Sequence, residues 1–355
     1  MNLLESARVR IDEIDAQMAA LFEERMKAVG DVIIYKRDNN MPILDAGREA
    51  LVVEKNTARI QNEELKSYYA DYIRYQMSLS RAYQAQVLGR DQVAYQGVEG
   101  AFSHIAAMRL FPHGRAVSFA TWEDVFDAVE SGRVARGVLP FENSNAGDVS
   151  DVLDLCYLRN LYVVDVYDLP VSQNLLALPG AKLSDIRDVY SHPQAISQSK
   201  PFLQANSLPT HAMTNTALAA KYVADSGDVS KAAIASPETA ALYGLQVLVP
   251  NINSDQDNTT RFIVVSKEKP TDGNRFSLLF TVDNKPGKLA EVIQCVGASG
   301  FNMESIKSRP MPHERFQYYF YIEVVGSPNA ESTRTLLTQL DKICRTVRLL
   351  GIYRK

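Results

Sequence analysis

The first 90 residues hold a single proline, Pro42, and this scarcity of helix breakers constrains the fold more than any other feature. Apolar residues recur at helical spacing between residues 5 and 38, at Ile11, Ile14, Met18, Leu21, Phe22, Val29 and Ile33. Gly30 interrupts this stretch at a tolerable cost of about 1 kcal/mol. We therefore predict one helix over 5–38, about 50 Å long, and two further helices near 47–61 and 65–88.

A helix of this length is far longer than the average helix of a globular protein. A domain of 90 residues cannot bury the whole apolar face of such a helix. We therefore expect a partner chain to complete the core. The prediction is an entwined all-α dimer, in a homodimer or a larger homo-oligomer.

Composition narrows the classes of function. The 355 residues suggest two or three domains, and 46 % apolar with 23 % charged residues is ordinary globular composition. The net charge is −4 without a long basic run, which argues against nucleic acid, so an anionic substrate would need a local cluster of cations. No apolar run is long enough for a membrane span, and the charged N-terminus shows no secretory signal.

Cysteine and histidine usage argues against metal sites. Cys156, Cys295 and Cys344 are few, odd in number and widely spaced, which fits a reducing cytoplasm. The five histidines, at 104, 113, 192, 211 and 313, show no metal-binding spacing. We expect no metal and a cytoplasmic location.

From residue 91 onward short apolar runs alternate with helical patterns. The runs with strand character are 93–95, 135–139, 161–166, 175–178, 188–190, 232–235 and 262–265. The helical patterns between them include 121–131, 195–205 and 216–224. This alternation predicts an α/β domain over 91–267 with a largely parallel sheet.

A polar stretch at 267–274 has the composition of a linker. The unit after it, 275–355, is expected to run strand 276–282, helix 287–298, strand 302–308, strand 316–325, helix 330–343 and strand 346–351. This is the βαββαβ order of an α+β ferredoxin-like domain.

Cations on the first helix follow its geometry. Arg25 and Lys36 lie three turns apart and share a face. Arg8 is rotated about 100° from Arg25, so it cannot easily join them from the same chain but could from a partner chain. On the third helix, Ser80 and Gln84 face one way.

The order of these residues resembles the all-helical chorismate mutase domain. The matching positions are Arg8, Ile11, Asp15, Glu24, Arg25, Lys36, Asp45, Arg48, Glu49, Ser80 and Gln84. The resemblance implies that Arg25 and a partner's Arg8 bind the two carboxylates of chorismate, and that Lys36 and Gln84 donate to its ether oxygen. It also implies that Glu49 accepts a hydrogen bond from the ring hydroxyl and that Asp45, Arg48 and Ser80 complete the pocket. Such a rearrangement needs no nucleophile, because positioning and electrostatics suffice.

Four polar segments mark the α/β domain. They are a GxxG turn at 97–100, Glu142-Asn143 at the end of an apolar strand, Ser191-His192-Pro193-Gln194 followed by Gln198, and Thr260-Arg261-Phe262. The turn could bind an anion through free backbone N–H groups. It lacks the GxGxxG pattern of a dinucleotide site, so no cofactor is expected. Alternation places Thr260 and Phe262 on one strand face and Arg261 on the other.

Together these segments resemble prephenate dehydratase. The family fold implies two α/β lobes with a cleft like that of periplasmic binding proteins, divided here near 168–172 and 249–257. The resemblance makes Thr260 the hydrogen-bond donor to the leaving hydroxyl, and implies substrate-binding roles for Glu142, Asn143, Ser191, Gln198, Arg261 and Phe262. Ala101 stands where the family usually has Thr, and His192 is expected to be structural.

The C-terminal unit resembles an ACT regulatory domain. The family's effector-binding stretches correspond to Gly287, Leu289 and Ala290, and to Ser308, Arg309 and Pro310. The resemblance implies inhibition by phenylalanine, although Lys307 replaces an acid and would repel the effector's ammonium group unless it turns away. An assembly domain without an effector is the alternative.

The order of the three parts resembles the bifunctional chorismate mutase–prephenate dehydratases of phenylalanine biosynthesis. These enzymes convert chorismate to prephenate, and prephenate to phenylpyruvate with loss of CO2 and water. A mutase fused to a prephenate dehydrogenase would need the missing nicotinamide fingerprint. A non-catalytic amino-acid sensor would not need the Arg, Lys and Gln set of the helical domain.

Overall fold

The computed structural model describes residues 2–39, 41–255, 257–312, 314, 316–327 and 331–354. Two residues named above, His313 and the first residue of the helix expected at 330–343, lie outside this part. The chain divides into two compact units, Met1–Asp91 and Gln92–Lys355, and each is described by itself. In the described part, none of the helices combines the length and the apolar character needed to cross a membrane.

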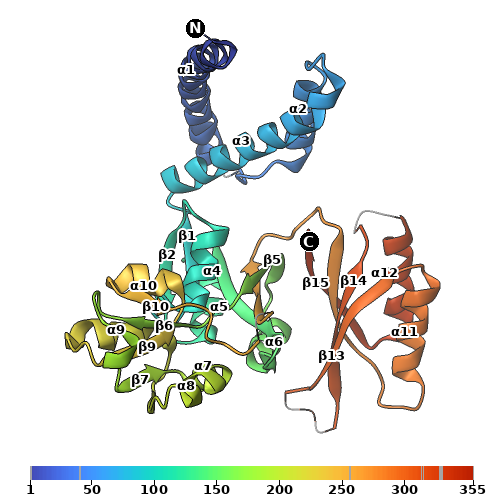
Figure 1. Ribbon diagram of the computed structural model, residues 1–355. Helices are drawn as coiled ribbons and strands as arrows, with labels where there is room; N and C mark the ends of the chain where they lie inside the picture. Colours follow the sequence, from blue (N-terminus) through green and yellow to red (C-terminus); the bar gives the residue numbers. More distant parts are fainter. Residues whose placement is uncertain are drawn as a thin grey trace. The chain divides into compact units, whose positions relative to one another are not determined.

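The first unit is all-helical (Figure 1). It contains α1 (Leu3–Asp38), α2 (Ala46–Thr57), the short 3-10 turn η1 (Glu63–Leu65) and α3 (Lys66–Val87). A capping box between Asn2 and Glu5 satisfies backbone N–H groups at the start of α1. The long first helix and the third helix are confirmed, but α2 ends four residues before the predicted 61. Its last residues, Asn56 and Thr57, are weak helix formers, and their carbonyls accept i+3 turn bonds instead.

The apolar face of α1 is only partly covered within one chain. Ile33 is buried together with Ala70, Ile73 and Met77 of α3. Five other apolar positions of α1 are 40–63 % exposed; they are Ile11, Ile14, Met18, Leu21 and Phe22. A stripe of this size on a helix of a soluble domain indicates a surface that something else covers.

The second unit contains two sheets. The first lobe uses β1 (Gln92–Gln96), β2 (Arg115–Phe119), β3 (Arg136–Asn143), β4 (Gly147–Asp148), β5 (Tyr162–Pro170) and β11 (Thr259–Ser266), with α4 (Phe102–Leu110), α5 (Trp122–Glu130) and α6 (Ser150–Leu158). The second lobe uses β6 (Asn174–Ala177), β7 (Asp188–Ser191), β8 (Thr210–Ala212), β9 (Lys231–Ala235) and β10 (Gln246–Val249). Its helices are η2 (Leu183–Asp185), α7 (Pro193–Gln198), α8 (Lys200–Ala205), α9 (Thr216–Ser226) and α10 (Pro237–Tyr243).

The prediction of a largely parallel sheet is wrong. β1 is parallel to β2 and β3, and β7 is parallel to β8 and β9. However, β11 runs antiparallel to both β3 and β5, and β6 runs antiparallel to both β9 and β10. β6 is the first strand of the second lobe, and β11 is the strand with which the chain returns to the first lobe. The sheet changes between β5 and β6 and again between β10 and β11, where the two lobe boundaries were predicted.

The helical pattern at 195–205 is two helices. α7 ends at Gln198 and α8 begins at Lys200. The cause is Pro201, which has no N–H to donate and whose ring excludes the carbonyl four residues earlier from a continuous helix.

The C-terminal region has the expected βαββαβ order. It consists of β12 (Arg275–Thr281), α11 (Lys288–Ala298), β13 (Asn302–Pro310), β14 (Tyr318–Val325), α12 (Glu331–Ile343) and β15 (Thr346–Tyr353). The two helices pack on one face of its sheet, around Val292, Leu336 and Leu340.

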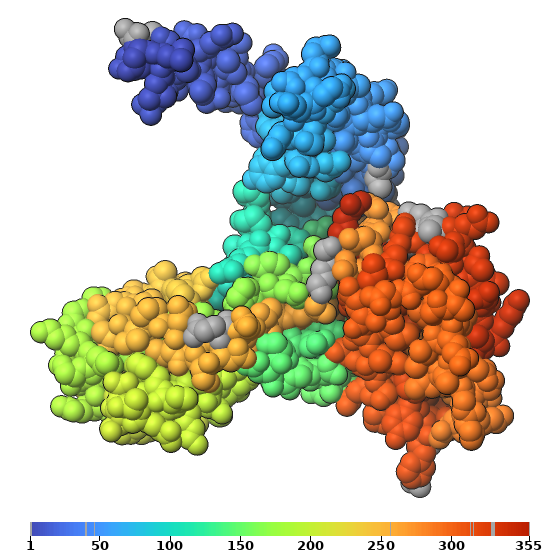
Figure 2. Space-filling view, turned by 45° about the vertical axis from the view of Figure 1, so that its right-hand side comes forward, coloured from blue at the N-terminus to red at the C-terminus, as the bar shows by residue number. Residues whose placement is uncertain are grey.

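The other face of this sheet packs on the first lobe. The ring of Tyr319 stacks on that of Tyr157 with centroids 4.1 Å apart, and Tyr321 contacts Phe141. β15 also pairs with β5 at Gly351 and Val163, so the sheet of the C-terminal region and the sheet of the first lobe form one ten-stranded sheet. In the space-filling view, the orange surface of the C-terminal region adjoins the green surface of the first lobe (Figure 2).

Candidate active sites

In the helical unit, α1 and α3 are joined by a polar contact. Arg25 Nη1 donates to Ser80 Oγ at 2.5 Å. Ser80 and Gln84 are buried on α3, and Gln84 Oε1 has no hydrogen-bond partner among the described residues. A buried amide oxygen without a partner is unusual for a purely structural helix pair.

Other predicted mutase residues make separate contacts. Lys36 Nζ donates to the carbonyl of Ile43, and Asp45 caps α2 by accepting from the backbone of Arg48. Glu49 forms an ion pair with Arg81 of α3, a residue that the sequence analysis missed. The side chain of Arg48 is exposed, and so is Arg8, which the structure does not bring to Arg25 within one chain.

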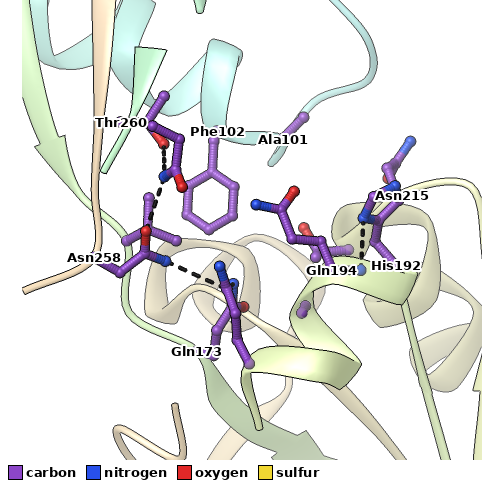
Figure 3. A pocket seen from close by; sticks show the side chains of 13 residues that line it. Ala101, Phe102, Gln173, His192, Gln194, Asn215, Asn258 and Thr260 are labelled. Carbon is purple, nitrogen blue, oxygen red and sulfur yellow. Dashed lines mark hydrogen bonds between the residues drawn. The ribbon is translucent and has the colours of Figure 1, made fainter. Parts of the chain in front are cut away.

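The second site is a cavity of about 160 Å³ between the two lobes (Figure 3). Residues from both lobes line it: Ala101, Phe102, Asn143, Val171, Gln173, His192, Gln194, Ala195, Gln198, Asn215, Thr216, Asn258 and Thr260. Three of the predicted residues, Asn143, Gln198 and Thr260, thus come together here. His192 also lines the cavity, and its Nδ1 caps α7 by accepting from Gln194 N.

A row of amides runs along this cavity and ends at Thr260. Asn143 and Thr260 are cross-strand partners on β3 and β11, and Asn143 Nδ2 donates to Thr260 Oγ1 at 2.9 Å and to Asn258 Oδ1 at 2.8 Å. Asn258 Nδ2 donates to Gln198 Oε1 at 3.3 Å, which also accepts from Gln173 Nε2 at 3.2 Å. Because Thr260 Oγ1 accepts from Asn143, its own hydrogen remains available for a bound molecule.

Two predicted substrate-binding residues are not in the cavity. Ser191 is fully buried at the end of β7, and its hydroxyl donates to the carbonyl of Ile234 at 2.6 Å. Phe262 lies on the same face of β11 as Thr260 but is buried in the core of the first lobe. Neither side chain lines the cavity, in contrast to the prediction. A motif gives the residue type and spacing, but it does not show whether a side chain faces the cavity or the core.

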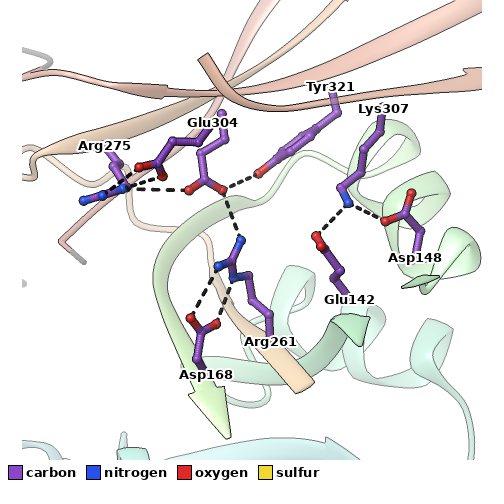
Figure 4. Close-up of polar contacts among 9 residues, drawn as sticks. Glu142, Asp148, Asp168, Arg261, Arg275, Glu304, Lys307 and Tyr321 are labelled. Carbon is purple, nitrogen blue, oxygen red and sulfur yellow. Dashed lines mark hydrogen bonds and ion pairs between the residues drawn. The ribbon is translucent and has the colours of Figure 1, made fainter. Parts of the chain in front are cut away.

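Glu142 and Arg261 are also outside the cavity, on the opposite face of the sheet (Figure 4). Arg261 Nε donates to Asp168 at 2.9 Å, and its Nη1 lies 3.8 Å from Glu323 of β14. The hydrogen bond to Asp168 raises the pKa of Arg261 above its ordinary value. Glu142 accepts from Lys307 at 2.7 Å. Strand alternation explains the placement, since each residue follows or precedes a cavity residue by one position.

The basic residues of β13 also face the first lobe. Lys307 Nζ bonds both Glu142 and Asp148, with its side chain only 9 % exposed. Arg309 pairs with Asp154, whose pKa is raised by burial but lowered on balance by the hydrogen bonds from Arg309 and Tyr319. In this structure Asp154 pairs with the Arg309 guanidinium, and a role of Arg309 in an effector site stays a prediction. The repulsion expected from Lys307 is removed by its two carboxylates.

The other predicted effector residues lie at two places in the C-terminal region. Gly287 is the N-cap of α11 with φ of 84°, and Leu289 and Ala290 are in the first turn. Ser308 and Pro310 lie in β13 and alternate with the two cations. Gly287 adopts a left-handed conformation that a residue with a Cβ would enter only with strain.

The cavity lining differs from the expectation of a local cation cluster. None of the described residues that line the cavity is Lys or Arg, so no cation cluster is present there. At the GxxG turn, Gly97 N donates to Phe119 O, Gly100 N to His104 Nδ1 and Ala101 N to Val98 O, so these three N–H groups are already bonded. The donors that remain at the cavity are side-chain amides, the Thr260 hydroxyl and the first N–H groups of α4 and α9. In the part of the chain that the structure describes, His, Cys, Asp and Glu side chains form no metal-binding group of three.

Comparisons with known proteins identify the families of both units. Residues 7–85 match the family model for chorismate mutase type II, and residues 93–270 match that for prephenate dehydratase. The chain is 30 % identical over its whole length to a bifunctional chorismate mutase/prephenate dehydratase of Aquifex aeolicus, covering 99 % of that protein. It is 35 % identical to arogenate dehydratase/prephenate dehydratase 2 of Arabidopsis thaliana, over 74 % of this chain and 73 % of the relative.

A solved structure supports the fold of the second unit. The prephenate dehydratase of Arthrobacter aurescens, solved in complex with L-Phe, is 26 % identical with a TM-score of 0.68. The alignment covers 74 % of this chain and 90 % of that one. The chain therefore belongs to the bifunctional chorismate mutase/prephenate dehydratase family, and it is an enzyme that converts chorismate to prephenate and prephenate to phenylpyruvate.

Proposed function

We propose that the cavity between the lobes is the dehydratase site and that Thr260 donates a hydrogen bond to the leaving hydroxyl. The observation that carries this proposal is the hydrogen bond from Asn143 Nδ2 to Thr260 Oγ1, which leaves the Thr260 hydrogen unused. Prephenate loses CO2 as its carboxylate C–C bond breaks, and those electrons expel hydroxide from the ring. Aromatisation supplies the driving force, so one well-placed donor to the departing oxygen contributes enough.

A cofactor-free coupled assay tests the two activities together. Purified protein is given chorismate alone, and phenylpyruvate is measured. Formation of phenylpyruvate supports both activities, whereas accumulation of prephenate would refute the dehydratase. Parallel samples with NAD+ test for a dehydrogenase, and a protein that binds the substrates without turnover would instead be a sensor.

We propose that Arg25, Lys36, Glu49, Ser80 and Gln84 form the mutase site, with Asp45 and Arg48 at its edge. The contact between Arg25 and Ser80 supports this assignment, as does the burial of the Gln84 side chain on the same helix. Lys36 and Gln84 would donate to the ether oxygen of chorismate, and Arg25 would bind one carboxylate.

We propose that the mutase site is shared between two chains of a homodimer or larger oligomer. The exposed apolar stripe of α1 supports a second chain, and Arg8 would reach the other carboxylate from that chain. Arg8→Ala and Arg25→Ala chains, each inactive alone, are mixed under conditions in which labelled subunits exchange. Return of mutase activity supports the shared site, and exchange without activity refutes it.

We propose three functional regions, residues 1–90, 91–267 and 275–355, and a phenylalanine site in the last. The L-Phe complex of the Arthrobacter relative supports an effector, and the left-handed Gly287 turn at the start of α11 supports its location. Leu289, Ala290, Ser308, Arg309 and Pro310 would line it. If phenylalanine inhibits at a distance, prephenate must weaken phenylalanine binding by the same factor. Calorimetric titration with and without prephenate measures this, and absence of heat with the full chain would refute the effector.

We also propose a cytoplasmic location, supported by three free cysteines of which Cys156 is buried.

A further inference from the structure

The centre of the amide row is Asn258, a residue that no motif singled out. Its side chain is 1 % exposed and stands just before β11, two residues from Thr260. It accepts from Asn143 and donates to Gln198, so it joins the first lobe to a helix of the second. Gln198 lines the cavity at the end of α7.

The orientation of every amide in the row follows from two backbone groups. Asn145 N and Ala146 N both donate to Asn143 Oδ1, at 3.1 and 2.9 Å. Asn143 must therefore present its Nδ2 to Asn258, so Asn258 must accept with Oδ1 and present Nδ2 to Gln198. Gln198 then receives that donor, and the one from Gln173, on its Oε1.

These hydrogen bonds determine which end of the Gln198 amide faces away from the other amides. With Oε1 occupied by two donors, Gln198 Nε2 points away from the row, and it has no acceptor among the described residues. A dianionic substrate in a cavity without lining cations requires donors, not acceptors. The reversed amide would present an oxygen to a carboxylate and repel it.

We propose that Asn258 is a positioning residue of the dehydratase site, which holds the Gln198 amide with Nε2 directed toward a substrate carboxylate. This inference rests on the proposed function of the cavity. Gln173 acts with it from the second lobe, through its own bond to Gln198 Oε1.

Asn258→Asp separates this role from simple packing, because the two side chains have the same shape. The introduced carboxylate can still accept from Asn143, but it cannot donate to Gln198, which must reverse. In its protonated form the introduced carboxyl could accept with one oxygen and donate with the other, as the amide does. Burial of the new carboxyl raises its pKa above the ordinary value of about 3.9. Activity relative to the wild type should therefore recover as the pH falls.

The experiment measures kcat and KM for prephenate from pH 5.5 to 8.5, in the full chain. Asn258→Asp is expected to lose about tenfold or more in kcat/KM at pH 8, mostly through KM, and to regain activity toward pH 5.5. Asn174→Asp is the matched control, since Asn174 is also 1 % exposed but bonds only outside the row. It should show no recovery of activity on acidification.

Asn258→Leu distinguishes amide orientation from charge repulsion. If Asn258 acts by donating to Gln198, the leucine variant should have low activity at every pH. If the aspartate variant fails only through charge repulsion, the leucine variant should have near wild-type activity. If Asn258→Asp does not fold, as judged by circular dichroism, Gln173→Glu makes the same change from the other side and should show the same recovery.

A flat ratio of variant to wild-type activity across this pH range, or near wild-type activity of Asn258→Leu, would overturn the positioning role. Failure of the wild-type chain to consume prephenate would instead overturn the proposed function of the cavity.

Discussion

Replacing Lys307 by Met should weaken both the fold of the second unit and the dehydratase site. Lys307 Nζ bonds Glu142 and Asp148, which are register partners on the β3–β4 hairpin (Figure 4). The hairpin also carries Asn143, whose oxygen accepts from the turn that joins the strands. One ammonium of the C-terminal region thus holds the hairpin that orients the amide beside Thr260.

The size of the effect follows from exposure. The Lys307 side chain is 9 % exposed, but its carboxylate partners are 36 and 41 % exposed, so water screens part of each interaction. Exposed ion pairs contribute about 0.2–1 kcal/mol each, and charged hydrogen bonds up to about 3 kcal/mol. We expect a loss of about 1–2 kcal/mol in total, which lowers Tm by about 2–8 °C for a unit of this size. Lys307 Nζ also lies 5.6 Å from the centroid of the Phe141 ring, and Met loses this cation–π contact together with the two ion pairs.

The assay combines thermal unfolding with both reaction rates. Lys307→Met should lower dehydratase kcat severalfold and leave mutase activity unchanged, and Lys285→Met, at an exposed lysine, serves as the control. A double-mutant cycle with Glu142→Gln isolates the pair and should give a coupling energy above about 0.5 kcal/mol. Strict additivity in that cycle, or an unchanged kcat in Lys307→Met, would refute the reasoning.

Three further predictions concern single residues. Thr260→Val should lower dehydratase kcat by more than about tenfold, or 1.4 kcal/mol, with mutase activity intact; retention of a tenth of the rate would remove Thr260 from the mechanism. Asp154 has a depressed pKa in the folded state, so its stabilising contribution is present above its unfolded pKa of about 3.9 and is lost as pH falls through the folded value. Urea unfolding of Asp154→Asn should therefore show a weaker decline of stability in acid than the wild type, and parallel curves would contradict this. Gly351→Val should lower Tm, because a Cβ there would meet the backbone of Val163; an unchanged Tm would show that the junction of β15 and β5 adapts.

Much of the fold follows from local patterns. The absence of breakers before Pro42 predicts α1, and short β-branched runs predict the strands of both lobes. Strand direction was not predictable, because β11 reads like any buried strand and nothing in its residues says that it returns from the other lobe. The break at Pro201 was visible in the sequence and was overlooked.

The site was predictable to the extent that motif residues share a face. Asn143 and Thr260 meet across two strands, whereas their neighbours Glu142 and Arg261 bind partners on the opposite face. Alternation alone already separates these two pairs. It also places Asn258 on the face of Thr260, so that residue could have been found. The ion pairs of Lys307 and Arg309 could not, since a charge does not encode a partner 165 or 155 residues away along the chain.

The junction of β5 and β15 has a consequence for protein solubility. In the ten-stranded sheet, β5 has β11 on one side and β15 on the other. Without the C-terminal region, β5 would lose its pairing with β15 at Val163 and would be an uncovered edge strand, and such edges recruit strands from other molecules. A chain shortened at Lys267 should therefore aggregate through β5, and the region that resembles a regulator also serves as a cover for the catalytic sheet. We therefore expect deletion of the region to damage the fold more than point substitutions at its predicted effector residues.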